Sequence, residues 1–368
     1  MIYLDNHATT KIDPLVLSEM MPYLTELYGN PSSRYHSFGW EAERAVENAR
    51  EQVAKLINAD PHEIIFTSGA TESNNMVIKC TKSSNIVTTY IEHSSILKPI
   101  AAFADHVIKL NVGYDGVFTV CYCDREIDFV SVMLANNETG VIQPISNLKE
   151  SFPNAKIHSD MAQALGKIPI NIKDLDVDYA SFSGHKLYGP KGVGALYIKD
   201  GTDNCIFPLL HGGGHEKGLR AGTQNVPSIV GFGKACELAK QRLDSDYWYI
   251  KTLKHQFYNC LLFRLGGDLI KFYGESAPNL PGCLCFSLKC GNMDVFLTEL
   301  GKNVAISSGS ACLSLSGSTS YVLTAMQIPE EEIKKSIRVS IGRFNTESEI
   351  LEAVDYIVDA FNKSFEGE

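Results

Sequence analysis

Short β-rich runs alternate with longer amphipathic stretches over the first two thirds of the chain, and this alternation strongly limits the folds available to it. The stretches Trp40–Ile57 and Thr71–Cys80 carry apolar residues at steps of three and four with charges opposite, as amphipathic helices do. Such alternation is typical of an α/β protein with a largely parallel sheet. The predicted strands are Glu63–Thr67, Asn85–Thr89, His106–Leu110, Phe129–Leu134, Lys156–Ser159, Tyr179–Ser181 and Ala195–Ile198.

The pattern changes after about Ser228. Long helical stretches are followed there by apolar strands near Cys283–Leu288 and Ile337–Ile341, and then by a final helix from Ser348 to about Phe361. A second, smaller α+β domain fits this order. No linker rich in Pro or Gly marks its start, so the boundary near residue 245 is soft. The predicted division is a large domain over residues 13–245 and a small domain built from residues 1–12 and 246–368.

Size and composition are those of an ordinary soluble globular protein: 368 residues, 44% hydrophobic and 21% charged. A net charge of -10 disfavours a protein that mainly grips nucleic acid, since that work needs a basic surface to displace counterions. No apolar run approaches the roughly 20 residues of a membrane helix, and the first residues lack the pattern of a signal peptide. We therefore expect a cytoplasmic protein whose main partner is neither nucleic acid nor membrane.

The ten cysteines are expected to be reduced thiols, because their number falls well short of a disulfide scaffold in a chain of this length. Two groups lie close together in the sequence, Cys121 with Cys123, and Cys283 with Cys285 and Cys290. Neither has the paired two-residue spacing of a zinc site. The sequence therefore predicts no metal centre.

A segment rich in Gly and small hydroxyl residues, 66–73, follows a predicted strand and opens a predicted helix. Backbone N–H groups at such a helix start can bind a phosphate. An ordinary capped helix start uses the same residues. Taken alone, the segment leaves both interpretations open and favours the ordinary cap.

A lysine and an aspartate stand at the ends of two predicted strands. Lys186 follows Tyr179–Ser181 after a Gly-containing turn, and Asp160 closes Lys156–Ser159. Open α/β sheets bind ligands at the carboxyl ends of their strands. A lysine there can form a Schiff base with pyridoxal 5'-phosphate (PLP), and an aspartate can keep the pyridine nitrogen of that cofactor protonated. A single lysine at a strand end is usually solvated, so the pair carries the prediction.

Two more polar residues lie near these strand ends. Gln163 follows Asp160 by three residues and can hydrogen-bond the phenolic oxygen of the cofactor if the chain turns there. His93 ends the Asn85–Thr89 region and can stack on the ring and carry protons. Taken alone, His93 is more simply read as a packed or solvated histidine.

Cys312 lies in a Ser- and Gly-rich segment, residues 306–320, that has little to bury. This composition is typical of a flexible loop. A structural cysteine would sit in an apolar strand or helix, and exposed thiols are usually avoided. We therefore predict that Cys312 is reactive.

Together these segments resemble the cysteine desulfurases of the NifS/IscS type, in the class V aminotransferase group of fold-type I PLP enzymes. The resemblance implies a large domain with a mainly parallel seven-stranded sheet and a smaller α+β domain that carries the cysteine loop. The matching segments run in family order over nearly the whole chain. They are Leu4–Thr10, Gly29–Ser33, Thr67–Asn74, Asn136–Gly140, Ser183–Gly192, His211–Glu216, Arg220–Thr223, Ser307–Ser314 and Ser336–Arg343.

The resemblance also implies roles for individual residues. The catalytic set would be Lys186 as the Schiff-base lysine, Cys312 as the persulfide carrier and His93 over the cofactor ring. Thr223 would reach the phosphate of the neighbouring subunit, so the enzyme would be a homodimer. Arg338 would pair with the carboxylate of L-cysteine. Cofactor binding would fall to Ala70, Thr71, Asn137, Asp160, Gln163, Ser183, His185, Lys186 and Thr223, and substrate binding to Asn6, Asn137 and Arg338.

The implied reaction removes sulfur from L-cysteine and leaves L-alanine and a persulfide on Cys312. The sulfur would then pass to an acceptor or scaffold protein for the assembly of iron–sulfur clusters or another thio-cofactor. The segment after Cys312 resembles that of the long-loop, IscS-like subgroup. It departs at Leu313, where a small polar residue is common, and at residues 317–319, where Leu-Glu-Pro is common, so loop mobility and the acceptor stay open.

Three alternatives compete. A fold-type I aminotransferase would share Lys186 and Asp160 but would have no use for a thiol on a mobile loop. A selenocysteine lyase would depend less on Cys312, because selenium is the better leaving group. A non-enzymatic protein that binds sulfur or a metal cluster would not need the lysine, aspartate and glutamine set, and it would lack the yellow colour of bound PLP.

Overall fold

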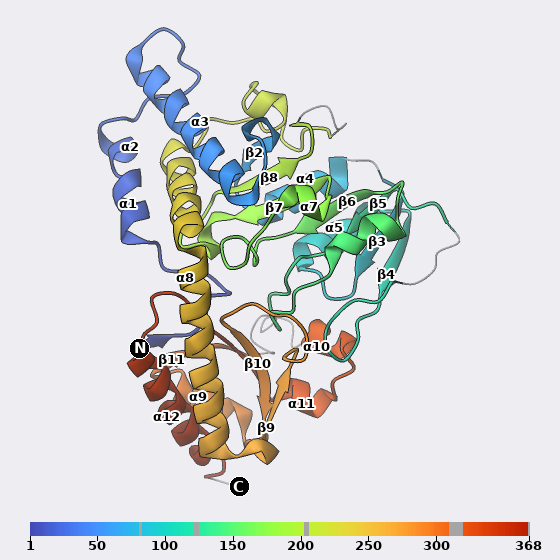
Figure 1. The fold of residues 1–368 in the computed structure, drawn as a ribbon, viewed down its shortest axis with the longest axis vertical. Helices are drawn as coiled ribbons and strands as arrows, with labels where there is room; N and C mark the ends of the chain where they lie inside the picture. Colours follow the sequence, from blue (N-terminus) through green and yellow to red (C-terminus); the bar gives the residue numbers. More distant parts are fainter. Residues whose placement is uncertain (81–82, 121–124, 202–205, 309–318, 367–368) are drawn as a thin grey trace.

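One long helix joins the two layered parts of the molecule. The computed structural model describes residues 1–80, 83–120, 125–201, 206–308 and 319–366. Helix α8, Val226–Leu265, runs from the upper part of Figure 1 to its lower part. Its first half is buried with the larger sheet, whereas Ile250, Leu253 and Phe257 are buried in the second part. The predicted boundary near residue 245 therefore falls inside a continuous helix.

The larger sheet confirms the predicted mainly parallel α/β architecture. Its order within the described chain is β2-β8-β7-β6-β5-β3-β4. The strands β4, β3, β5, β6 and β7 run parallel to one another, and β8 runs antiparallel to both β7 and β2. The bounds are β2 (Ile64–Thr67), β3 (Asn85–Thr89), β4 (His106–Leu110), β5 (Phe129–Ser131), β6 (Lys156–Asp160), β7 (Tyr179–Ser183) and β8 (Gly194–Ile198).

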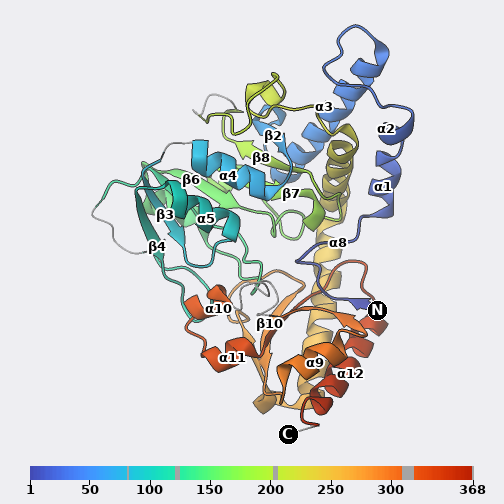
Figure 2. The same ribbon diagram turned by 180° about the vertical axis from the view of Figure 1, so that it is seen from behind.

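Helices cover both faces of this sheet (Figures 1 and 2). Alternate strand residues point to opposite faces, so Phe66 and Val130 are buried with α3 and α8, whereas Ile65 and Phe129 are buried with α4 and α5. The helices of this part are α1 (Pro14–Met20), α2 (Pro22–Thr25), α3 (Ser37–Ile57), α4 (Ala70–Cys80), α5 (Ser94–Phe103), α6 (Leu148–Ser151) and α7 (Ile172–Leu175). Short 3-10 turns are η1 (Pro61–Glu63), η2 (Ile145–Asn147), η3 (Gly184–Lys186) and η5 (Glu216–Gly218).

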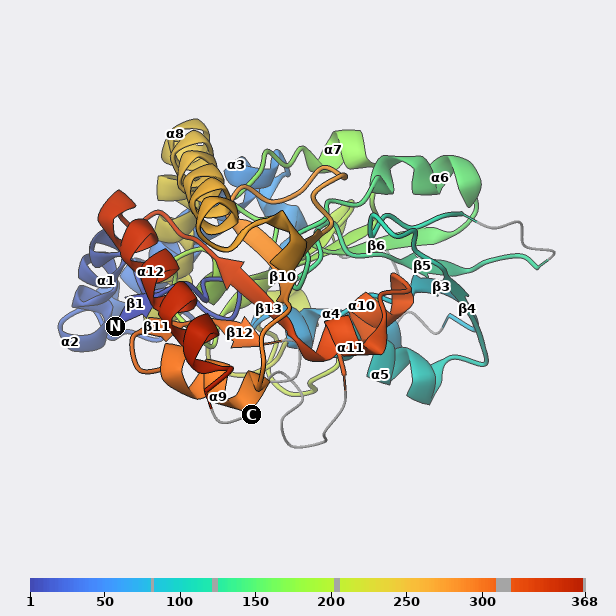
Figure 3. The same ribbon diagram turned by 90° about the horizontal axis from the view of Figure 1, so that it is seen from below.

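The second part is the predicted α+β unit. An antiparallel sheet with the order β12-β13-β10-β9 packs beside α9 and α12 (Figure 3). The N-terminal β1 (Ile2–Tyr3) joins this part by pairing with β11 (Val304–Ala305). Its other elements are η6 (Gly267–Leu269), β9 (Ile270–Tyr273), β10 (Cys283–Leu288), α9 (Met293–Leu300), β12 (Ser307–Ser308), α10 (Tyr321–Ala325), α11 (Glu330–Lys334), β13 (Ser336–Ser340) and α12 (Glu347–Lys363).

In the described part of the chain, no helix has the combination of length and apolar character needed to cross a membrane.

Candidate active site

Asp160 and Lys186 lie at the same edge of the larger sheet. Asp160 ends β6, directly beside Ser181 of the parallel neighbour β7, and Lys186 follows β7 within the turn η3. Both residues line a cavity of about 590 Å³. The predicted residues that line this cavity with them are Ala70, Thr71, His93, Asn137, Gln163, Ser183, His185 and Arg338.

The carboxylate of Asp160 is held in a fixed orientation. Its Oδ2 accepts a hydrogen bond from Asn74 Nδ2 at 2.8 Å, and its Oδ1 accepts one from the Ala162 N–H at 3.0 Å. Asn74 is itself held by Ser95 Oγ at 2.8 Å. Asp160 is 7% exposed. The protein therefore fixes the position and orientation of this carboxylate in the wall of the cavity.

The amine of Lys186 meets the N-terminal segment of the chain. Its Nζ donates to the carbonyl oxygens of His7 and, at 2.8 Å, Ala8. The neighbouring His185 contacts Thr9 Oγ1 through Nδ1 at 3.1 Å. Burial, followed by the charge of Lys186, lowers the pKa of His185 to about 4, so its imidazole is neutral near pH 7.

The start of α4 forms one wall of the cavity. Ser68 and Gly69, directly after β2, line it together with Ala70 and Thr71. First-turn N–H groups of a helix have no acceptor within the helix and favour an anion. The backbone at Gly69 also lies close to the start of β8. A Cβ at Gly194 would lie only 2.7 Å from Gly69 Cα. This wall suits a phosphate group.

Arg338 is fixed by three groups from distant parts of the chain. It donates to Asn137 O at 2.8 Å, to Ser307 Oγ at 2.7 Å and to Asp5 Oδ1 at 2.7 Å. The side chain of Arg338 is 7% exposed. In the described structure, Asn137 Oδ1 is buried in the same region without a hydrogen-bond partner. A guanidinium beside a buried amide oxygen is suited to an amino acid that carries both a carboxylate and an amine.

His93 also caps α5. Its Nδ1 accepts from the Ser95 N–H at 3.2 Å and contacts Ser95 Oγ at 2.7 Å. These contacts occupy Nδ1, and the side chain of His93 lines the cavity.

The structure does not bring every predicted residue to the cavity wall. The amide of Asn6 instead donates to Ser340 O at 2.8 Å and Asn345 Oδ1 at 3.2 Å, tying the N-terminal segment to β13. Thr223 is exposed and is not among the residues lining the cavity. Cys312 and Leu313 lie outside the described residues, as do Cys121 and Cys123.

Burial raises the pKa of three described cysteine thiols. Cys283, Cys285 and Cys290 are buried free thiols. Burial raises the pKa of Cys283 to about 11, which keeps it protonated near pH 7. Across the ranges that the structure describes, no group of three His, Cys, Asp or Glu side chains is placed to hold a metal ion.

Other residues at the site were missed by sequence reasoning. Asp5 accepts a hydrogen bond from Arg338, and Asn74 donates one to Asp160. Lys191 lines the cavity. His7 is 3% exposed and lines it too. Burial, and next the charge of Lys167, holds the pKa of His7 well below its usual value. The only sequence signal for these residues was their position inside the matching segments.

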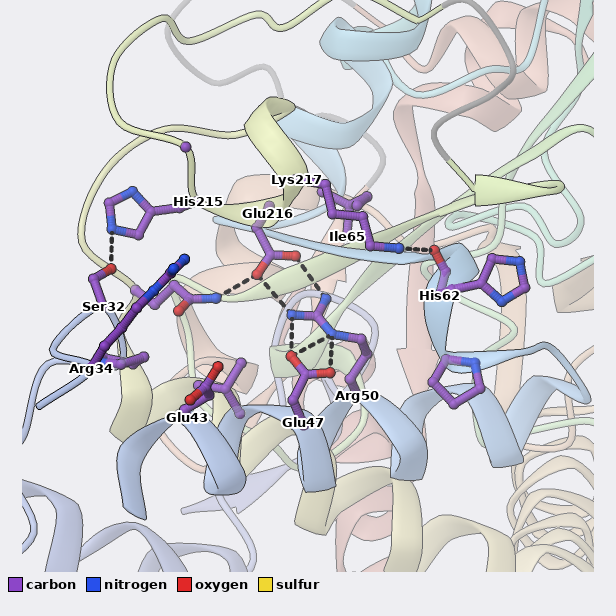
Figure 4. A pocket seen from close by; sticks show the side chains of 15 residues that line it. Ser32, Arg34, Glu43, Glu47, Arg50, His62, Ile65, His215, Glu216 and Lys217 are labelled. Carbon is purple, nitrogen blue, oxygen red and sulfur yellow. Dashed lines mark hydrogen bonds and ion pairs between the residues drawn. The ribbon is translucent and has the colours of Figure 1, made fainter. Parts of the chain in front are cut away.

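A buried ion pair anchors the segment that carries Thr223 (Figure 4). Arg50 on α3 pairs with Glu216 at 2.7 Å, and Glu216 also accepts from the Phe66 N–H at 2.8 Å and from Gln224 Nε2 at 2.5 Å. Arg50, Glu216 and Gln224 border a second cavity of about 580 Å³. The segment is therefore fixed to α3 and β2 of the same chain while Thr223 stays exposed.

Several known proteins are similar to this chain over most of its length. The chain is 45% identical to the mitochondrial cysteine desulfurase of Arthroderma benhamiae, over 98% of this chain and 73% of that protein. The solved structure of a NifS-like protein superposes with a TM-score of 0.89 at 36% identity, covering 97% of this chain and 98% of the other. The structure of SspA in complex with cysteine matches at 30% identity with a TM-score of 0.79, covering 94% and 100%. The predicted fold-type I architecture is thereby confirmed. Residues 2–352 match the aminotransferase class-V family, to which the chain belongs.

Proposed function

We propose that this chain is a PLP-dependent cysteine desulfurase, which removes sulfur from L-cysteine and releases L-alanine. The observation that carries the proposal is the placement of Lys186, Asp160 and Arg338 around one cavity. The lysine and the aspartate suit a PLP aldehyde and its pyridine nitrogen, and the arginine suits an amino-acid carboxylate. The family membership and the names of the similar proteins support the same assignment.

The residues around the cavity fit PLP. Ala70, Thr71, Ser183 and His185 would hold the phosphate, where the start of α4 provides N–H donors. Asp160 would face the pyridine nitrogen. Gln163 would face the phenolic oxygen, and His93 and Asn137 would lie near the ring. When bound, PLP withdraws electrons from the α-carbon of the amino acid joined to it.

The side chains divide the remaining work. Arg338 and Asn137 orient the carboxylate of cysteine, so that the α-proton meets the amine of Lys186, which removes it. The thiolate of Cys312 then attacks the substrate sulfur. The new S–S bond forms as the C–S bond breaks, and the electron pair left on the β-carbon takes up a proton, with His93 Nε2 as the carrier. Alanine leaves, and the sulfur stays on Cys312 as a persulfide.

We also propose a homodimer and a protein partner that receives the sulfur. Two copies would form a homodimer in which exposed Thr223 completes the phosphate site of the other subunit, with a large domain over 13–245 and a small domain over 1–12 and 246–368. An acceptor or scaffold protein for iron–sulfur or thio-cofactor assembly would receive the sulfur. The cytoplasmic location stays a prediction, because a similar enzyme is named as mitochondrial.

Product analysis tests the proposed function. We expect the purified, yellow protein with PLP, L-cysteine and a thiol reductant to release alanine and sulfide in equal amounts. An aminotransferase would instead require a keto acid and release no sulfide. Selenocysteine serves as the comparison substrate, and a large preference for it in kcat/KM would favour the lyase. A colourless protein that binds no PLP would overturn the whole assignment.

Arg338→Ala is expected to raise the KM for cysteine by about 30- to 1000-fold, corresponding to the loss of a charge-assisted pair worth about 2–4 kcal/mol. The absorption band of the bound cofactor should not change. Because Arg338 also pairs with Asp5, Asp5→Asn is the matched control for loss of that internal contact. If Arg338→Ala shows the parent KM, the substrate carboxylate binds elsewhere.

A further inference from the structure

The proposed chemistry does not use Lys167, which holds one end of the Gln163 amide. Lys167 Nζ donates to Gln163 Oε1 at 2.9 Å. Gln163 Nε2 in turn donates to His7 O at 3.0 Å. The same His7 oxygen accepts from Lys186 Nζ. A chain of hydrogen bonds therefore runs from Lys167 through Gln163 and His7 to the amine of the site.

A closed turn after β6 sets this contact. The N–H of Leu165 donates to Met161 O at 3.1 Å, and that of Lys167 donates to Ala164 O at 3.0 Å. Gly166 has φ +66, and a Cβ there would lie 2.0 Å from Leu187 Cδ1. Only glycine fits this position without a clash. The turn brings residues 163 and 167 together as part of the fold, so the contact does not depend on a loose surface lysine.

The two contacts of Gln163 fix which way its amide points. An ammonium group has only donors, so it selects the amide oxygen, and the carbonyl of His7 selects the amide nitrogen. The reversed amide would set two oxygens against each other at His7 and would face N–H groups with N–H groups at Lys167. Nε2 carries a second N–H, and Gln163 lines the cavity. The residue therefore presents a donor to the cavity, where a reversed amide would present an acceptor.

We propose that Lys167 is a positioning residue that makes Gln163 a hydrogen-bond donor toward the phenolic oxygen of the cofactor. This inference rests on the proposed function. A hydrogen-bond donor stabilises negative charge on the phenolic oxygen. This oxygen would then attract less strongly the proton on the nitrogen that joins Lys186 to the cofactor, so that nitrogen would lose its proton more easily. The pH at which the bound cofactor changes colour is therefore held low by Lys167.

The environment of Lys167 supports this role. Burial, and next the charge of Lys186, lowers the pKa of Lys167 to about 7. A site of this kind destabilises the charged form of a lysine. A lysine whose only role was to make the protein soluble would therefore gain nothing from this position. Below this pKa the ammonium form selects Gln163 Oε1 because it has only donors. Above it the neutral amine still has N–H groups for Gln163 Oε1, and the His7 carbonyl continues to select the amide nitrogen.

The test is a pH titration of the visible absorption of the bound cofactor. Lys167→Met keeps the length of the side chain and removes its donors, and we expect the midpoint to rise by roughly one to two pH units. Gln163→Leu should give the same rise. The double variant should show no further rise, because both changes remove one interaction. The affinity of the apoprotein for PLP, measured in parallel, should fall in all three.

Two controls separate positioning from general damage. Lys167→Arg keeps donors for Gln163 and should keep the parent midpoint. Lys254→Met removes a buried lysine outside the cavity, which contacts Glu275 at 3.0 Å and Asn279 at 2.9 Å, and it should also titrate as the parent does. If Lys167→Met does not fold, Lys167→Gln replaces it, because it removes the charge and shortens the reach to Gln163.

The outcomes are distinct. A parent midpoint in folded Lys167→Met, or equal shifts that add in the double variant, would overturn the role assigned to Lys167. A parent protein that takes up no PLP would overturn the proposed function itself, before any variant is compared.

Discussion

Lys186→Ala is expected to lower desulfurase turnover by on the order of 10⁴-fold, because it removes both the covalent attachment of the cofactor and the amine that moves the α-proton. PLP should still bind through its phosphate and Asp160, so the apoprotein should keep a measurable affinity for it. The measurement is alanine release from cysteine, together with the absorption spectrum. The band of covalently attached cofactor should be absent from the variant.

Lys191 provides the matched control, since it is a second lysine lining the same cavity. Lys191→Ala should keep the band of covalently attached cofactor. Borohydride reduction of the parent followed by peptide mapping should place the cofactor on Lys186. Finding it on Lys191 or Lys167, or finding near-parent turnover in Lys186→Ala, would show that the attachment site is assigned wrongly.

Lys186→Ala also tests the proposed homodimer. Thr223 lies on an anchored segment but away from its own cavity. When inactive Lys186→Ala subunits are mixed and exchanged with subunits of a Thr223 variant that has lost activity, one site of each heterodimer contains neither defect. An equal random mixture should therefore regain about a quarter of the parent activity. If exchange is confirmed and nothing is regained, both residues serve a site within one chain.

Sequence patterns predicted the regular elements well where burial alone decides them. The bounds of β3 and β10 agree with those predicted, because nearly all of their residues are buried in a sheet. The bounds of β4 agree as well, although most of this edge strand is not buried. β5 ends at Ser131, three residues before the predicted Leu134. Val132 and Leu134 are still buried, and their N–H groups bond to His158 O and Asp160 O. Hydrophobicity records burial there but not the end of regular pairing.

The domain boundary shows another limit of the sequence. The region near residue 245 is polar on several sides, and no breaker residue marks it. The structure places it inside α8, whose buried residues belong to one core up to Ala239 and to the other from Ile250. A change of core partner along one helix leaves no Pro or Gly signal, so a boundary of this kind is invisible to composition.

The functional site also has residues that the sequence predicts and residues that it does not. Lys186 and Asp160 could be predicted because strand ends in a parallel sheet meet at one edge. The residues that support the site could not be predicted, because Asn74, Asp5 and Lys167 reach Asp160, Arg338 and Gln163, respectively, only through the turns and helices that the whole fold positions. A polar residue on an amphipathic element looks solvated in sequence until its partner is known.

Cys312→Ser is expected to abolish sulfur transfer while leaving PLP binding intact, since this residue has the single role of attacking the substrate sulfur. A serine hydroxyl is a far weaker nucleophile toward sulfur near pH 7, so alanine release should fall by on the order of 10³-fold or more. Cysteine should still change the absorption of the bound cofactor, because the steps before sulfur transfer use Lys186 and Asp160. The variant thus separates cofactor chemistry from sulfur removal.

Peptide mapping after brief exposure to cysteine without reductant locates the sulfur. The parent should carry one added sulfur on Cys312, and the serine variant should carry none at that position. Cys283 and Cys285 are the internal controls, because burial keeps the pKa of each thiol above its usual value and both side chains are inside the protein. Added sulfur on either of them, or alanine release at the parent rate by Cys312→Ser, would remove Cys312 from the mechanism. The protein would then be a PLP lyase whose handling of the sulfur is unknown.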